Sequence, residues 1–457
     1  MRWSATRQGR KKKDSVQLGR DYWRLWSATI VSNVGDGISM VAYPWLASAV
    51  TRSPLLIALA GMIGRLPWLI FTLPAGVITD RFSRKRIIVA MDLFRGALTF
   101  IIATIVLFGA DTLPDLDQLT SITNLETNWG LYWVVIISAF LFGCAEVLRD
   151  NSAQTFMPAI VAKEKLEIAN GRMWSAEFVA NSFLGPALGS FLIGVSVALP
   201  FFADGATFII AAVVIAMIGV KEVQRSKVVD VKSDRPTGGL VANFKAEVSE
   251  GVRWLWNHKL LRSMAIILGL LNLIGALEGA LFILFAQEIL KTSVFQFAVL
   301  GTAGAIGGIL GGTLGPKISK KFGRARSLAL VLIASPVASF ATAIANHWLQ
   351  VWVFIFWGAL LGVLWNIITV SLRQSIIPAE LLGRVNSVYR LFAWGSLPIG
   401  MAIAGGLVQA LSAVVSREMA LRAPYLLAGF AGVLLFLYSR GRLNDELIES
   451  AQKQAEG

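Results

Sequence analysis

Residues 76–86 read Gly76-Val-Ile-Thr-Asp80-Arg81-Phe82-Ser83-Arg84-Lys85-Arg86 and lie between two long apolar runs. The run before them, residues 55–78, and the run after them, residues 87–108, are each long enough to cross a bilayer as a helix. Because the turn is so short, the two helices must be antiparallel neighbours. Arginine and lysine do not cross lipid cheaply, so we expect this basic turn to face the cytoplasm.

The composition of the whole chain indicates a membrane protein. Of the 457 residues, 55% are hydrophobic and only 15% are charged, whereas a soluble domain carries about 25% charged residues. Repeated apolar runs of about 20 residues predict an all-α polytopic bundle and not a β-barrel, whose strands alternate polar and apolar residues over about 10 positions. The formal net charge of +14 lies in short loops and tails beside the spans. Membrane topology explains this charge, so we expect no nucleic-acid partner.

Cysteine and histidine are almost absent from the chain. Cys144 is the only cysteine, and the two histidines, His258 and His347, lie far apart in the sequence. A disulfide framework or a metal cluster built from these residues is therefore not expected. The sequence also lacks a phosphate-binding glycine loop and a zinc-binding helix motif. We therefore expect neither an enzyme nor a cofactor. We predict that an ion gradient supplies the energy, with protons as the coupling ion and sodium as the alternative.

Twelve apolar spans and one long polar segment divide the chain. The predicted units are a basic cytoplasmic tail (1–24), a six-helix half (25–220), a cytoplasmic linker with an interfacial helix (221–262), a second six-helix half (263–440) and a cytoplasmic tail (441–457). Connections on the predicted cytoplasmic side are basic. The opposite connections are poor in bases, and the exceptions are Arg52, Lys291, Arg417 and Arg422.

The two halves resemble each other in sequence. Gln154-Thr-Phe-Met-Pro158 follows the fourth span, and Gln374-Ser-Ile-Ile-Pro378 follows the tenth. Asp36 in the first span, followed by a glycine, parallels Glu278 in the seventh, also followed by a glycine. A six-helix unit repeated in the same orientation is typical of transporters, and it predicts a substrate site near the membrane midplane between the halves.

Ionisable residues deep in a span are costly in lipid and are therefore candidates for function. Our candidates for proton coupling are Asp36, Glu278 and, about midway along the second span, Arg65. Burial favours the protonated form of a carboxyl group, whereas a nearby arginine such as Arg65 favours the ionised form. This competition suggests a basis for exchange. The alternative is a static ion pair, or an acid facing water, that stabilises the bundle.

Further candidates fall into two groups. Charged residues near the cytoplasmic ends of spans three to five predict a network that rearranges as the halves move, namely Asp92, Arg95, Glu146, Arg149, Asp150 and Glu177. For Arg149 and Asp150, the alternative is a side chain that reaches the membrane interface. The wall of the substrate cavity should be apolar and aromatic, and the candidates from spans one, two, ten and eleven are Tyr43, Trp68, Trp365, Asn366, Phe392 and Trp394.

These features together resemble the major facilitator superfamily. Residues 76–86 are similar to that family's signature between helices two and three, which is a glycine, three residues, an aspartate, an arginine and a basic cluster. Ser83 stands where a glycine is usual. The resemblance implies two pseudo-symmetric halves of six helices and a cytoplasmic gate in which Asp80 contacts the start of helix eleven. The signature residues here are Gly76, Asp80, Arg81, Arg84 and Lys85.

Within that family, the Gln-x-x-x-Pro connections and Gly185-Pro186-Ala-Leu-Gly189 resemble the branch of enterobactin and macrolide exporters. The Gly-Pro-x-x-Gly pattern is also similar to the antiporter motif in helix five of drug-efflux members, although close helix packing would equally explain it. We therefore predict a monomeric, proton-coupled exporter of amphiphilic small molecules such as drugs, macrolides or siderophores. It would lie in the plasma membrane, or in the inner membrane of a double-membrane bacterium.

Two alternatives remain open. The first is a carrier of lysophospholipid or another solute with the same architecture. The second is a membrane sensor or scaffold that transports nothing. The carboxyl groups at Asp36 and Glu278 and the lack of a sizeable soluble domain argue against the second alternative.

Overall fold

The computed structural model describes residues 18–71, 74–75, 78–79, 82–115, 118–162, 165–219 and 240–456, and this part of the chain is helical without a strand. The first half comprises α1 (Arg20–Val50), α2 (Pro54–Ile70), α4 (Arg84–Phe108), α5 (Trp129–Ile160), α6 (Leu166–Val179), the π-helical turn η4 (Ala180–Leu184), α7 (Gly185–Val195) and α8 (Leu199–Ala216). The second half comprises α10 (Lys259–Gly279), α11 (Phe282–Leu284), the π-helical turn η5 (Phe285–Ile289), α12 (Val294–Phe322), α13 (Arg324–Ala343), α14 (Trp348–Ile376), α15 (Ala379–Leu411) and α16 (Arg417–Ser439).

Within the described residues, twelve segments fit twelve membrane spans. Ten helices of this part of the chain are long and apolar enough to cross a bilayer, and α2 is a shorter apolar helix of 17 residues. The 31-residue helix α1, which contains Asp36 and Pro44, completes the set. One span is built from α6, η4 and α7, and another from α10, α11 and η5. The predicted all-α bundle of twelve helices in two halves is confirmed.

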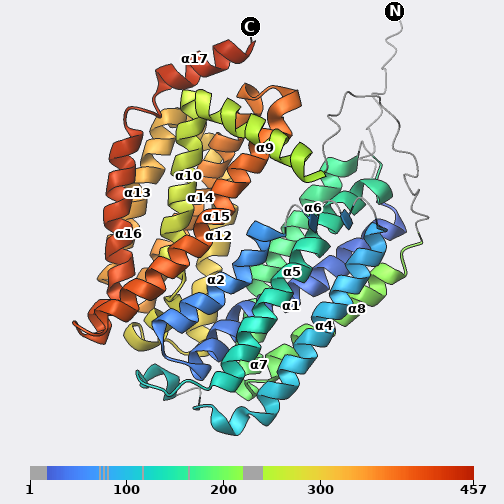
Figure 1. Ribbon diagram of the computed structural model, residues 1–457, viewed down its shortest axis with the longest axis vertical. Coiled ribbons are helices and arrows are strands. Elements are labelled where there is room, and N and C mark those ends of the chain that lie inside the picture. Colours follow the sequence, from blue (N-terminus) through green and yellow to red (C-terminus); the bar gives the residue numbers. More distant parts are fainter. Residues whose placement is uncertain are drawn as a thin grey trace, which may run out of the picture.

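The two halves lie side by side, with the first in blue to green and the second in yellow-green to red (Figure 1). They meet along two helix pairs, because α2 packs against α15 and α7 packs against α12. Small residues permit this close approach. A Cβ atom at Gly405 of α15, for example, would lie only 2.6 Å from the Cβ of Ala58 in α2.

The two ends of the bundle differ. One end, which we call the tail end, carries α9 (Leu240–Asn257) and α17 (Asp445–Glu456) (Figure 1). The opposite end, which we call the loop end, carries the short helices η1 (Ala110–Thr112) and η2 (Gln118–Thr120). The helix expected in the linker corresponds to α9, which packs against α15 and α10.

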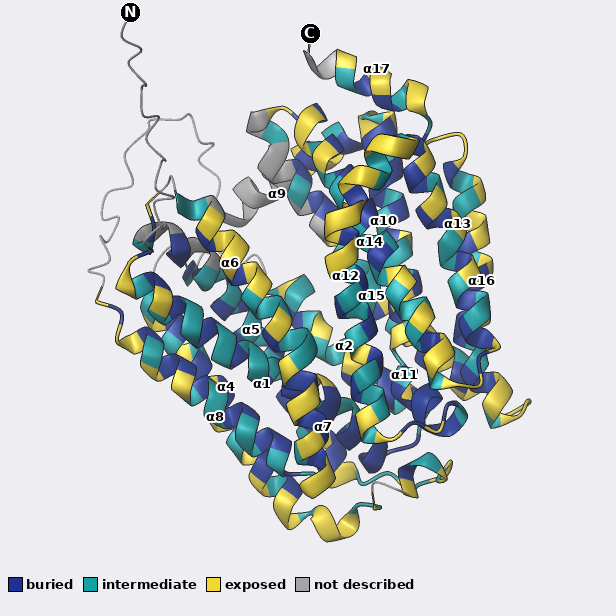
Figure 2. Ribbon diagram, turned by 180° about the vertical axis from the view of Figure 1, so that it is seen from behind, coloured by how far each residue is buried: buried dark blue, intermediate teal, exposed yellow. Residues whose placement is uncertain are grey.

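The outer faces of the bundle are apolar. Figure 2 shows exposed residues along many of the helices, and large apolar side chains such as Phe191, Phe430 and Leu434 are among the exposed ones. Such a surface suits a bundle surrounded by lipid, where every spanning segment also satisfies its own backbone hydrogen bonds. Inside, each half has its own clusters of buried apolar side chains.

Some predicted features lie outside the described residues. These are residues 1–17 of the N-terminal tail, residues 221–239 of the linker, and Gly76, Asp80 and Arg81 of the signature turn.

Candidate functional site: a cavity between the halves

A cavity of about 1140 Å³ lies between the two halves. At the tail end, the exposed residues Asn170 and Trp174 of α6 lie on its wall. Towards the loop end, it is lined by Ala47, Ile283 and Phe297. The cavity therefore extends along most of the bundle, from near the loop end to the tail end, and its volume lies just above the usual range of small-molecule sites.

Charge is distributed unequally over the cavity wall. The first half contributes seven charged lining residues, namely Asp36, Arg65, Arg95, Glu146, Arg149, Asp150 and Glu177. The lining residues of the second half that the structure describes are uncharged, namely Gly279, Ala280, Phe282, Ile283, Phe297 and Met401. One wall can therefore hold charges or protons, while the other offers an apolar surface.

A ladder of ion pairs joins α1, α4 and α5 within the first half. Arg95 of α4 donates to the Asp36 carboxylate of α1 at 2.5 Å and lies 3.9 Å from Asp92. Arg149 of α5 continues the ladder to Asp92 at 3.3 Å and to Asp150 at 3.6 Å. These five residues, which we call the charge ladder, bring together most of the network that was predicted from the sequence.

Aromatic rings hold the centre of the charge ladder in place. The guanidinium carbon of Arg95 lies 4.4 Å from the ring centroid of Phe142 and 4.0 Å from that of Phe208. Ring faces attract a cation, and the attraction is stronger where water is excluded. Arg95 is therefore fixed between α5 and α8 while it points its charge at Asp36.

The three predicted coupling residues are not brought together. Asp36 pairs with Arg95 and not with Arg65, which lies exposed on the cavity wall. Glu278 is not among the lining residues, although the next residue, Gly279, is. The Oε1 atom of Glu278 is buried in the second half without a hydrogen-bond partner among the described residues. The reason is rotational, since adjacent residues on a helix point in directions about 100° apart.

The predicted gate residues that the structure describes occupy two places. Asp92 and Arg95 belong to the charge ladder, and Glu146 lines the cavity without an ion pair or hydrogen bond to another described residue. Arg84 and Lys85 begin α4 at the tail end, and the Lys85 ammonium donates to the Ile218 carbonyl after α8 at 2.7 Å.

Of the six predicted cavity-wall residues, only Tyr43 is among the residues that line the cavity. Trp68 of α2 and Trp394 of α15 instead stack on each other across the boundary between the halves, with ring centroids 5.1 Å apart. Trp365 is buried in the core of the second half, and Phe392 packs against that core. Asn366 is exposed and does not line the cavity.

The Gly-Pro-x-x-Gly motif forms a backbone contact between α7 and α1. A Cβ atom at Gly185 would lie 2.5 Å from the Cα of Gly37, and one at Gly189 would lie 2.8 Å from the Ile38 carbonyl oxygen. Pro186 is buried beside them. The motif therefore supplies close helix packing, and the π-helical turn η4 immediately precedes it. Such turns occur often at functional sites.

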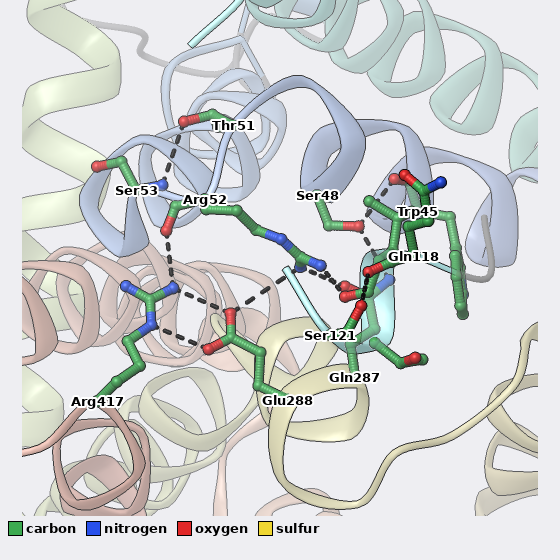
Figure 3. A network of polar contacts seen from close by, with 12 residues as sticks. Trp45, Ser48, Thr51, Arg52, Ser53, Gln118, Ser121, Gln287, Glu288 and Arg417 are labelled. Atoms are coloured by element: carbon green, nitrogen blue, oxygen red, sulfur yellow. Dashed lines mark hydrogen bonds and ion pairs between the residues drawn. The ribbon is translucent and has the colours of Figure 1, made fainter. Parts of the chain in front are cut away.

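Sequence reasoning missed a polar network that closes the loop end (Figure 3). Arg417 of α16 donates to both carboxylate oxygens of Glu288 in η5 at 3.0 Å and to the Arg52 carbonyl at 2.8 Å. The guanidinium of Arg52 lies 4.0 Å from Glu288 and donates to Gln287 at 2.5 Å. Gln287 in turn donates to Ser48 of α1 at 3.0 Å. We call these five residues the loop-end latch, and it joins the two halves.

The loop-end latch is largely buried. Arg52 is only 2% exposed, and it also donates to the Leu119 carbonyl. Burial lowers the pKa of Arg52 to about 10 although Glu288 opposes the shift, so the guanidinium remains charged at neutral pH. Two arginines thus share one carboxylate, which makes Glu288 the only anion that balances them among the latch residues.

A signal for the latch was present in the sequence. Arg52, Lys291, Arg417 and Arg422 are the exceptions to the otherwise base-poor connections on this side. Each of them has a fixed oxygen partner: Lys291 donates to the Thr120 carbonyl at 2.7 Å, and Arg422 donates to the Ala343 carbonyl at 2.6 Å. A base that departs from the topological pattern therefore marks a structural contact.

Comparisons with known proteins agree with this architecture. The multidrug efflux pump Tap of Mycolicibacterium fortuitum is 26% identical over 419 residues, which cover 89% of this chain and 94% of that protein. Macrolide efflux protein A of Streptococcus pyogenes is 24% identical over 390 residues, which cover 84% of this chain and 88% of that protein.

Solved structures share the fold at low sequence identity. A bacterial homologue of the iron transporter ferroportin in an inward-facing state superimposes with a TM-score of 0.67 at 15% identity, over 95% of this chain and 99% of the other. A bacterial homologue of the lysosomal transporter Spinster gives 0.63 at 13% identity, over 95% and 97%. The family model of the Major Facilitator Superfamily matches residues 25–397. The chain therefore belongs to the Major Facilitator Superfamily and is a multi-pass membrane transporter.

Proposed function

We propose that this transporter exports amphiphilic small molecules, such as drugs, macrolides or siderophores, in exchange for protons by alternating access. One observation carries the proposal: a cavity with carboxylates on one wall and apolar side chains on the other extends to one end of the bundle, while the loop-end latch seals the opposite end. The apolar wall suits the apolar part of an amphiphile, and the carboxylates can bind protons. Relatives described as efflux pumps support the direction of transport.

The tail end faces the cytoplasm in this proposal. Basic residues begin α4 (Arg84, Lys85, Arg86) and end α12 (Lys320, Lys321), and such bases favour the cytoplasmic side. Substrate then enters from the cytoplasm or the inner leaflet, and the latch prevents its escape until the halves rock. The transporter acts as a monomer in the plasma membrane and needs no cofactor beyond the ion gradient.

Charges in the first half connect substrate and proton. Glu146 and Glu177 line the cavity without an ion pair or hydrogen bond to another described residue, and the Asp36 carboxylate is held by Arg95. A proton taken up by a carboxyl group of this half changes the charge that the substrate meets at this wall. Substrate and proton therefore favour different states of the same cavity, which is the requirement for exchange.

Transport in proteoliposomes under an imposed pH gradient tests the proposal. The panel is ethidium as a lipophilic cation, erythromycin as a macrolide and enterobactin as a catecholate siderophore, with lysophosphatidylcholine as the lipid control. We expect at least one of the first three to move against its gradient, with protons released in the opposite direction. Movement of the lysophospholipid alone, or transport that ignores the pH gradient, would contradict the proposal.

A further inference from the structure

Asp204 of α8 is a fully buried carboxyl group that the charge ladder does not include. Its exposed fraction is 0%. Its Oδ2 atom accepts the Ser39 hydroxyl of α1 at 2.6 Å, and its Oδ1 atom has no hydrogen-bond partner in the described part of the chain. Gly35 of α1 leaves room for this atom, because a Cβ there would lie 2.4 Å from Oδ1.

No base neutralises this carboxyl group directly. Among the described residues, Asp204 forms no ion pair, and the charged groups that act on it from the helices packed around it are Asp36 of α1 and Arg95 of α4. These two already pair with each other, so neither is a direct partner of Asp204. The remaining titratable neighbour is Tyr43 of α1, and α7 contributes no ionisable residue.

An ionised carboxylate in this position would be expensive. Burial of a charge without a partner costs far more than burial of a neutral, hydrogen-bonded acid. The neutral acid can share its single hydrogen bond with Ser39, whose hydroxyl oxygen can accept the acid proton, and this leaves Oδ1 as an uncharged carbonyl oxygen. The pocket around Asp204 therefore suits a carboxyl group that carries a proton in the conformation described here.

Ser39 connects this carboxyl group to the cavity. Its hydroxyl donates to Asp204, and the residue also lines the cavity wall. A hydroxyl group can accept a proton from cavity water while it gives its own proton to the carboxylate, and it can do the reverse. One side chain thus joins a sealed acid to the aqueous space without exposing the acid.

We propose that Asp204 is the group that carries the coupling proton, that Ser39 relays this proton to the cavity, and that Asp36 acts by holding Arg95 away from Asp204. The assignment rests on the proposed function, because it names the proton site of that exchange. It also assigns different roles to two acids on neighbouring helices.

Infrared titration of the purified transporter in detergent tests the site without any substrate. We expect the carbonyl band of protonated carboxylic acids to lose one component in Asp204→Asn, and we expect that component to move to a new frequency in Asp204→Glu. In Ser39→Ala the component should remain but shift, because its hydrogen bond is lost. The control Glu278→Gln removes another buried acid and should leave the Asp204 component unchanged. An Asp204→Asn spectrum identical to the wild-type spectrum at every pH would overturn the assignment, and the Glu and Ala variants decide the matter if the Asn variant does not fold.

A transport assay distinguishes failure of the exporter proposal from failure of the assignment of the proton to Asp204. With ethidium in proteoliposomes, Asp204→Asn should keep exchange of labelled for unlabelled ethidium but lose accumulation driven by a pH gradient. If the wild type accumulates ethidium on a pH gradient and Asp204→Asn does so equally well, the assignment of the proton to Asp204 is wrong and the exporter proposal stands. If the wild type moves none of the panel compounds on a pH gradient while the infrared component is lost as expected, the exporter proposal fails and the buried proton site stands.

Discussion

Arg95 places a full positive charge inside the first half, where its side chain is almost completely buried. Its side chain is 2% exposed, and it lies between two aromatic rings with the Asp36 carboxylate as its nearest partner. Removal of one member of a buried ion pair leaves the other charge without compensation, which typically costs 3–5 kcal/mol of stability. The pair is therefore a single unit in which neither residue can be changed alone.

Asp36→Asn should abolish export driven by a pH gradient. It should also lower the free energy of unfolding by about 3 kcal/mol. This value is at the low end of the range for a buried pair, because Asp92 remains 3.9 Å from Arg95. Thermal unfolding and proton-driven ethidium transport measure the two effects. Asp21→Asn on the same helix is the control, because Asp21 forms a partly exposed pair with Arg24 that is worth about 0–1 kcal/mol. Asp36→Asn vesicles that exchange substrate for protons at the wild-type rate would show that the pair is not needed for coupling.

Close contacts between helices depend on glycines, which have no side chain to hold the backbones apart. Helices α1 and α7 touch through Gly37, Gly185 and Gly189, so their backbones lie closer than any side chain would allow. The contact lies on the part of α1 that also carries Asp36 and Ser39. A shift of α7 against α1 would therefore displace the charged wall of the cavity.

Gly185→Ala should force α1 and α7 apart, because its Cβ would meet the backbone of Gly37 at 2.5 Å. Overpacking of this kind costs about 1–3 kcal/mol, so we expect a lower unfolding temperature and slower transport. Gly194→Ala lies in the same helix with nothing within 4 Å of its added Cβ, and it should behave as the wild type does. Equal unfolding temperatures for the two variants would show that the helices are not in the contact described.

The elements themselves were largely predictable, whereas their rotation about their own axes was not. Apolar runs of about 20 residues fixed the number of spans, and the basic turn around Arg84 and Lys85 fixed their alternation. Hydropathy does not say which face of a span points at which neighbour. For this reason Arg65 was expected beside Asp36, where Arg95 lies, and Trp68 and Trp394 were expected on the cavity wall, where they stack on each other instead.

At the scale of the whole molecule, the loop-end latch and the cavity correspond to one conformation in the alternating-access cycle that we propose. In that cycle, the polar contacts of the latch must separate before the loop end can open. Glu288 holds Arg417 in its own half and faces Arg52 from the other half. Loss of this carboxylate would leave two positively charged arginines facing each other. Separation of the two side chains into water would then lower their electrostatic free energy.

Glu288→Gln should therefore shift the bundle toward the conformation that is open at the loop end. A cysteine at Ala47, in a background in which Cys144 is replaced by alanine, reports this opening through its reaction with a membrane-impermeant maleimide in right-side-out vesicles. We expect labelling to be about tenfold faster, which corresponds to about 1.4 kcal/mol.

Glu418→Gln is the matched control for the latch, because it removes an exposed ion pair with Arg422 in the helix that also carries Arg417. Its labelling rate should equal that of the parent. A rate for Glu288→Gln that also equals the parent rate would mean that the latch does not hold the loop end closed.

The unequal distribution of charge over the cavity wall affects how such a transporter can change under selection. The two halves share a repeated sequence, but they line the cavity differently, since the seven charged lining residues all belong to the first half. If the proposed exchange is right, a substitution at Phe282, Ile283, Phe297 or Met401 alters the shape offered to a new compound and leaves the proton-binding groups in place. In that exchange, adaptation to a new compound is open to the second half at little cost in coupling, while the first half stays constrained by its charges.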